Sequence, residues 1–188
     1  LGWTLDAARL SGQLGAPLGV ESQPAEIFGV ADAVQVVAGA EFACAMTAAG
    51  RVWCWGRNQY GQLGDGTTGG EPCGPGGPRQ CRGPAPVLGL EAAVAIGAGY
   101  AHACAVIADG TVQCWGHNAM AQIGDGHAGG PGCGGECQPS PATVELLGDA
   151  LAVVGGLEHT CALRRGGQVA CWGRNHLGSL ARSPAELA

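Results

Sequence analysis

The ten cysteines of this chain carry its clearest chemistry, because six of them recur at one spacing. The six form three pairs whose members stand ten residues apart: Cys44 and Cys54, Cys104 and Cys114, and Cys161 and Cys171. Cysteines close together in sequence can form disulfides, bind a metal ion, or pack as small buried apolar side chains. The elements that carry each pair decide between these outcomes.

Each pair is carried by two short strand-like runs that flank a glycine-containing turn. In the first copy the runs are residues 42–46 and 52–55. This pattern predicts a β-hairpin, and a turn centred on Ala49 places Cys44 directly opposite Cys54. Opposed residues of an antiparallel pair have Cα atoms about 4.5–5.5 Å apart, which is within reach of a disulfide. We therefore expect three cross-strand disulfides, with three layers of buried free cysteines as the alternative.

The other four cysteines lie in two Gly- and Pro-rich loops at the same point of successive copies. They are Cys73 and Cys81 in residues 67–86, and Cys133 and Cys137 in residues 127–141. These loops have little apolar content, so a disulfide would serve to order each one. Cys133 and Cys137 also resemble half of a zinc site, but the neighbouring sequence offers no second pair of ligands. We therefore expect five disulfides and no metal ion, which indicates an extracellular or periplasmic location.

The paired cysteines belong to a longer phrase that returns after 60 and again after 57 residues. Each copy has a further run of small and β-branched residues before its hairpin, at residues 36–39, 95–99 and 152–156, which predicts a first strand. A fixed period of this length is typical of repeat architectures. We expect one repeat domain over residues 1–188. Its copies are residues 1–33 in part, 34–92, 93–149, and 150–188 in part.

The composition fits a folded β protein and argues against nucleic-acid binding. The chain has 36 glycines and 11 prolines, yet 46% of its residues are hydrophobic, so disorder is not expected. Its 9 basic residues are all arginine and its net charge is −6, whereas a nucleic-acid binder needs clustered basic residues. No apolar run approaches the roughly 20 residues that span a bilayer. The chain starts at Leu1 with no signal-peptide pattern, so we expect an excised piece of a longer protein.

The motifs around each Cys-Trp-Gly carry a family resemblance. Residues 57–64 read Arg-Asn-Gln-Tyr-Gly-Gln-Leu-Gly, and residues 157–163 read Leu-Glu-His-Thr-Cys-Ala-Leu. They resemble the repeat of the regulator of chromosome condensation (RCC1) family, in which Gly-x-x-His-Thr-x-Ala-Leu precedes Val-x-x-Trp-Gly-x-Asn-x-x-Gly-Gln-Leu-Gly. The resemblance covers about residues 34–180, and residues 12–15 resemble the tail of an earlier copy.

The resemblance implies an all-β fold, a β-propeller built from four-stranded antiparallel blades. The family ring normally has seven blades, and this chain offers about three full repeats with parts of two others. We therefore expect a partial RCC1-like propeller. The remaining blades would come from missing sequence, which we favour, or from other chains, since an open arc leaves sheet edges exposed. The added cysteines fit a secreted bacterial form of the family better than a nuclear one.

The recurring histidines and tryptophans are expected to build the blades. His102 and His159 invite a catalytic or metal-binding role, but Phe42 stands at the same position of the first copy. Because phenylalanine has no such chemistry, a packed structural role is the better interpretation. Blade packing is likewise expected of three equivalent tryptophans: Trp55, Trp115 and Trp172.

Trp53 differs from these tryptophans because Gln113 and Ala170 replace it in the other copies. We expect Trp53 to be exposed and, together with Tyr60, to contact a protein partner.

The sequence favours a non-enzymatic scaffold that binds protein partners through blade loops, and it predicts no catalytic residue and no cofactor. No serine–histidine–aspartate set, paired carboxylates or phosphate-binding loop stands at a usable spacing. Two alternatives follow from the resemblance. One is guanine-nucleotide exchange on a small GTPase, the activity of the nuclear prototype of the family. The other is inhibition of a secreted enzyme, as by a bacterial β-lactamase inhibitor of this fold.

Overall fold

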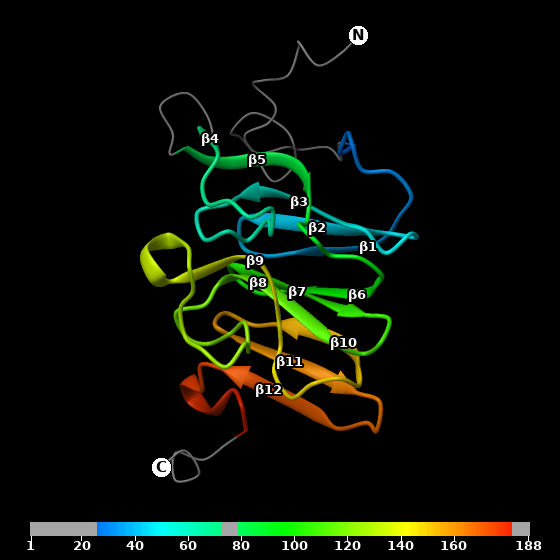
Figure 1. Cartoon of the computed structure of the whole chain (residues 1–188), viewed down its shortest axis with the longest axis vertical. Coiled ribbons are helices and arrows are strands. Elements are labelled where there is room, and N and C mark those ends of the chain that lie inside the picture. The colour runs from blue at the N-terminus through cyan, green and yellow to red at the C-terminus, as the bar shows by residue number, and fades with distance from the viewer. Residues whose placement is uncertain (1–25, 73–78, 182–188) are drawn as a thin grey trace.

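Three antiparallel β-sheets follow one another along the chain and lie face to face in a stack (Figure 1). The computed structural model describes residues 26–72 and 79–181. Within these residues the helical structure consists of two short 3₁₀ turns, η1 (Cys133–Gly135) and η2 (His176–Gly178). The predicted all-β class is therefore confirmed. We refer to the three sheets, in chain order, as the first, second and third blade.

Each blade is an antiparallel sheet whose strands pair with their neighbours in sequence, except that β3 of the first blade pairs with β5. The first blade has the order β1-β2-β3-β5-β4, with β1 (Ala33–Ala38), β2 (Phe42–Thr47), β3 (Val52–Arg57), β4 (Glu71–Pro72) and β5 (Arg79–Pro86). The second blade contains β6 (Ala93–Ala98), β7 (His102–Ile107), β8 (Val112–His117) and β9 (Cys137–Thr143). The third blade contains β10 (Ala150–Gly155), β11 (His159–Arg164) and β12 (Val169–Gly173).

The blades depart from the expected four strands in two places. In the first blade, the strand pair β4–β5 folds part of the long Gly- and Pro-rich loop back on itself and adds a short fifth strand. In the third blade, the described residues supply three strands. The second blade has the expected four, with its long loop closed by η1 instead of an extra strand.

The central hairpin of every blade has the register that its sequence predicts. Cys44 lies opposite Cys54, Cys104 opposite Cys114, and Cys161 opposite Cys171. All three pairs are disulfide-bonded, with Cα atoms 4.0–4.1 Å apart. A fourth disulfide joins Cys133 to Cys137 across η1. The fifth predicted bridge involves Cys73, which lies outside the described residues.

Two apolar cores fill the spaces between neighbouring blades. Successive side chains of a strand point to opposite faces of its sheet, so the second blade contributes to both cores. The first core includes Phe42, Cys44, Met46 and Val52 of the first blade and Ile96, Ala103, Ala105 and Trp115 of the second. The second core includes Cys104, Val106, Val112 and Cys114 of the second blade and Val153 and Ala162 of the third. The stack therefore buries both faces of the second blade.

Candidate functional site

His102 is packed into the junction of the second and third blades. It is fully buried, and its Nε2 lies 2.9 Å from the Thr160 hydroxyl, which itself donates to the backbone carbonyl of Gln122. The hydroxyl proton is used in that bond, so Nε2–H donates to Thr160. Among the described residues, His102 Nδ1 has no hydrogen-bond partner. Burial, assisted by His117 and His159, lowers the pKa of His102 to about 4, so the ring is neutral at pH 7.

The repeated tryptophans pack between blades and also hydrogen-bond across them. Trp115 is fully buried, and its indole Nε1 donates to the carbonyl of Gln62 in the preceding blade at 3.0 Å. Trp172 makes the equivalent bond to Gln122 at 2.9 Å. Trp55 is buried as well. These contacts support the blade-packing role that the sequence indicates.

His159 repeats the position of His102 on the third blade but has a different environment. It is half-buried, whereas His102 is fully buried. Its imidazole lies against Gly156, as that of His102 lies against Gly99. The two histidines belong to separate blades and form no shared site.

A recurring asparagine holds the base of each long loop. The sequence shows this asparagine as part of the family motif, but it was not predicted to have this role. Asn58 is fully buried; its amide donates to the carbonyl of Thr67 at 3.2 Å, and its oxygen accepts from the Leu63 amide at 3.1 Å. Asn118 makes the same pattern in the second blade: its amide donates to the carbonyl of His127 at 3.2 Å, and its oxygen accepts from the Ile123 amide at 3.0 Å. The signal was present, because this asparagine follows Trp-Gly-x in all three copies.

Tyr60 bridges two blades instead of standing free. Its ring is half-buried and lies against the imidazole of His117 in the second blade, with centroids 4.6 Å apart. His117 is in turn within hydrogen-bond distance of Gln122, its Nδ1 lying 2.8 Å from the amide nitrogen. Part of the Tyr60 ring therefore serves the first junction, and the remainder is exposed.

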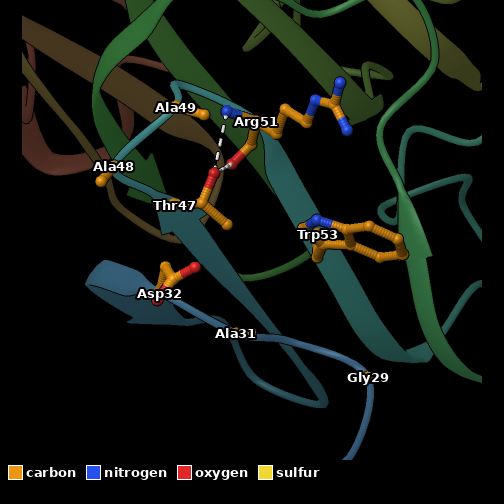
Figure 2. A pocket seen from close by; sticks show the side chains of 8 residues that line it. All are labelled: Gly29, Ala31, Asp32, Thr47, Ala48, Ala49, Arg51 and Trp53. Carbon is orange, nitrogen blue, oxygen red and sulfur yellow. Dashed lines mark hydrogen bonds between the residues drawn. The ribbon is translucent and has the colours of Figure 1, made fainter.

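Trp53 lines a hollow at the hairpin end of the first blade (Figure 2). The hollow has a volume of about 500 Å³, and its walls come from three segments: the stretch before β1, the β2–β3 turn and the start of β3. Its lining residues are Gly29, Ala31, Asp32, Thr47, Ala48, Ala49, Arg51 and Trp53. The turn is fixed by a hydrogen bond of 3.3 Å from the Arg51 amide to the Thr47 hydroxyl.

The side chains that give this hollow its character differ between the repeats. Arg51 is replaced by Thr111 and Gln168, and Trp53 by Gln113 and Ala170. The backbone frame is common, since Ala48, Ala108 and Arg165 donate equivalent bonds to Asp32, Ala92 and Asp149. The hollow is therefore a blade-specific surface on a repeated frame.

The described residues contain no group of three or more His, Cys, Asp or Glu side chains placed to hold a metal ion. Across residues 26–72 and 79–181, no helix is long and apolar enough to cross a membrane. The hollow presents an indole face, a guanidinium and a carboxylate, from Trp53, Arg51 and Asp32.

Comparison with protein families finds matches that contain all three hairpins. A model described as "Regulator of chromosome condensation (RCC1) repeat" matches residues 33–62, 93–122 and 151–179. A second model of the same description matches residues 49–106. Together they cover more than half of the chain.

Curated relatives are longer than this chain. The secretion-regulating guanine nucleotide exchange factor of Bos taurus is 35% identical over 162 residues, which are 81% of this chain and 32% of that protein. The E3 ubiquitin-protein ligase HERC2 of Mus musculus is 33% identical over 147 residues, 75% of this chain and 3% of the ligase. The chain thus spans at most about a third of these relatives.

Solved structures share the fold. Yeast RCC1 (Prp20), solved bound to Kap60, superposes with a TM-score of 0.67 at 22% identity, covering 84% of this chain and 35% of that one. Human WBSCR16 superposes with a TM-score of 0.62 at 20% identity, covering 80% and 35%. At this level of identity the likeness establishes architecture, and it identifies the three stacked sheets as blades of a partial propeller.

Proposed function

This chain belongs to the regulator of chromosome condensation (RCC1) repeat family, and we propose that it is a non-enzymatic scaffold that binds a protein partner. The partner would be recognised by residues that differ between the repeats, at the two ends of the blade strands. The repeats themselves are taken as residues 34–92 and 93–149, with partial copies at 1–33 and 150–188.

One observation carries this proposal: in the first two blades a recurring asparagine is buried, whereas a position that varies between the repeats is exposed. Asn58 and Asn118 are both fully buried and both hold a loop base. Arg51, by contrast, is exposed, and the other repeats have different side chains at its position. Variable groups on a rigid β framework are the usual arrangement of a binding protein.

The long loops are the first candidates for contact with the partner. They leave the blades at the carboxyl ends of β3 and β8, so they lie at the same end of the stack (Figure 1). The second is braced by the Cys133–Cys137 disulfide and by a bond from the Gly132 amide to the Cys137 carbonyl. A braced loop loses less conformational entropy on binding than a free one.

An extracellular or periplasmic location is part of the proposal. Four disulfides lie within the described residues, three of them inside blade hairpins. Structural disulfides persist in oxidising compartments and are rare in the cytosol.

Guanine-nucleotide exchange is the second candidate, favoured by the 35% identity to a secretion-regulating exchange factor. Fold and family alone do not decide it, because a propeller hosts many unrelated activities. The assay is release of a fluorescent GDP analogue from a panel of purified small GTPases. If the chain accelerates release of the GDP analogue, its function is nucleotide exchange and not binding alone.

The scaffold proposal is tested by exchanging loop residues 127–136 for a short Gly-Ser turn in the full-length protein. Partners cross-linked to the unaltered protein are identified by mass spectrometry, purified, and titrated against both forms by calorimetry. We expect the exchange to weaken the partner at least tenfold. The matched control exchanges the β7–β8 turn, residues 108–110, for the sequence of the β2–β3 turn. A further variant carries the loop exchange together with replacements of Arg51 and Trp53. If this variant binds every partner with unchanged affinity, the proposal is refuted.

A further inference from the structure

The hollow beside Trp53 lies at the opposite end of the blade from the long loops. β3 runs from Val52 at the β2–β3 turn to Arg57, and the first long loop leaves after Arg57. The hollow is built on that turn, whereas the loops project from the far end of the strands (Figure 1). A ligand in the hollow would therefore occupy a surface that is separate from the loops.

Arg51 supplies an unneutralised cation at this hollow. Ion pairs neutralise four other arginines of the described residues: Arg57 with Glu41, Arg82 with Asp65, Arg164 with Asp149, and Arg174 with Glu158. Within those residues, the Arg51 guanidinium has no ion pair. On a chain of net charge −6, an unpaired guanidinium is the place where a carboxylate finds attraction instead of repulsion.

Arg165 is a comparable arginine, because it has no ion pair among the described residues either. It is exposed in the β11–β12 turn and does not line the hollow. An exposed cation without a shaped surface contributes little specific binding energy. Arg165 therefore serves as a natural control for charge without shape.

Trp53 supplies an apolar surface next to that cation. Residues 51 and 53 stand two apart at the start of the strand, so their side chains leave the same face of the sheet. The indole is half-buried, and Figure 2 shows it on the same side of the hollow as Arg51. Tryptophan and arginine are both among the residue types enriched at the energetic centres of protein interfaces.

Asp32 defines the other side of the hollow, across from Arg51 and Trp53 (Figure 2). At the equivalent position of the third blade, Asp149 is held by Arg164, and that ion pair lowers the pKa of the Asp149 carboxyl. Asp32 lines the hollow with no ion pair among the described residues. Its carboxylate repels a second acid and accepts N–H donors, so a bound segment has one preferred direction.

We propose that this hollow binds a partner segment in which an Asp or Glu side chain stands next to a large apolar one. The carboxylate accepts a forked pair of hydrogen bonds from Arg51, and the apolar side chain packs on the Trp53 indole. Backbone N–H groups of the segment face Asp32. The inference rests on the proposed function, because it names the chemistry of one contact of the partner.

The test uses the whole 188-residue chain and a blocked peptide, acetyl-Gly-Glu-Leu-Gly-amide, as the probe. Peptides with Gln or Lys for Glu, and with Ala for Leu, are the ligand controls. Binding is followed by NMR through the indole Nε1–H of Trp53 and the backbone amides of residues 47–49. We expect saturable shifts with the Glu-Leu peptide, weaker at high salt, and at least tenfold weaker binding of the Gln and Ala peptides.

Two variants use residues that the second blade already tolerates: Arg51→Thr and Trp53→Gln. Each is expected to lower the affinity at least tenfold with the spectrum of the rest of the chain unchanged. Arg165→Gln, which removes a cation without removing the hollow, should leave binding intact. Equal binding of the Glu and Gln peptides, unchanged binding by Arg51→Thr, or absence of any saturable shift would overturn the inference.

The outcome separates this inference from the proposed function. If the loop exchange weakens the natural partner while Arg51→Thr leaves its affinity unchanged, the scaffold function stands and the hollow has no part in it. If the peptide binds as expected but no partner responds to either change, the hollow binds such segments and the scaffold function fails.

Discussion

The second and third blades have the same hairpin and the same cysteine pair, yet one is buried on both faces and the other on one. Val112 at the start of β8 is 0% exposed, whereas Val169 at the same position of β12 is 65% exposed. The first blade shows the mirror case: Val36 in β1 is 67% exposed, while Ile96 in β6 is 3% exposed. The comparison teaches that each repeat encodes two apolar faces, and that burial depends on a neighbouring blade.

The first junction, between the first and second blades, and the second junction, between the second and third blades, have different side chains at one equivalent position. In the first junction Phe42 packs into an apolar core with Ala103. In the second, His102 takes the place of Phe42 and hydrogen-bonds to Thr160, which takes the place of Ala103. A polar pair can therefore substitute for an apolar one in this frame, provided that both partners change together.

The largest expected effect is a loss of stability, and it compares Trp115 of the second blade with Trp172 of the third. Trp115→Ala should lower the free energy of unfolding by about 3–5 kcal/mol, because it opens a cavity in a closed core and breaks the bond to Gln62. Trp172→Ala should cost about half as much, since the Trp172 indole is only half-buried and loses less apolar contact on truncation. Urea denaturation followed by circular dichroism gives both values. Equal losses would mean that the third blade is as closed as the second.

We expect low pH to destabilise the second junction, between the second and third blades. The folded-state pKa of His102 is about 4, below the ordinary value of 6.5, so the unfolded chain binds the proton first as pH falls. Stability is full above about pH 6.5 and is lost progressively down to about pH 4, by roughly 3 kcal/mol. Denaturation curves at several pH values measure this slope.

A double variant, His102→Phe with Thr160→Ala, provides the control for the acid effect because it copies the pair of the first junction. It should flatten the stability profile between pH 6.5 and 4. A slope that survives this replacement would assign the acid sensitivity to other groups, such as His117, whose pKa burial also lowers.

The smallest expected difference is between the hairpin disulfides of the second and third blades. Replacing both Cys104 and Cys114 with Ala should cost about 2–3 kcal/mol, the loop-closure contribution of a bridge of this span. The Cys161–Cys171 bridge closes a loop of equal length but is half-buried, so a limited amount of dithiothreitol should reach it first. Alkylation and peptide mapping over time report the order. Reduction of Cys104 and Cys114 at the same rate would show that burial does not protect them.

Much of the scaffold could be predicted from the sequence, because its determinants are local. The register of each hairpin depends on a turn of a few residues, so the opposed cysteines followed from spacing alone. The packing role of Trp115 and His102 followed from their recurrence. The fifth strand β4 was missed, because a two-residue strand within a Gly- and Pro-rich loop leaves almost no periodic signal.

The candidate site could be predicted only in part. Trp53 was singled out because the other repeats lack it, but Arg51 and Asp32 were not. Nothing in their sequence environment shows that Arg51 has no counter-ion among the described residues while Arg57, six residues later, pairs with Glu41. Ion pairing depends on which side chains from distant segments meet in space, and residue spacing within a strand carries no such information.

The sequence by itself determined the repeat, the hairpins, the cysteine pairing and the identity of the family, since all of these depend on contacts between residues close along the chain. Only the tertiary structure decided which blade faces are covered, which arginines are neutralised, and that the turn of the first blade and the stretch before β1 enclose a hollow. Those properties arise where different segments of the chain come to lie side by side, and the neighbouring segment then decides the packing and the ion pairing.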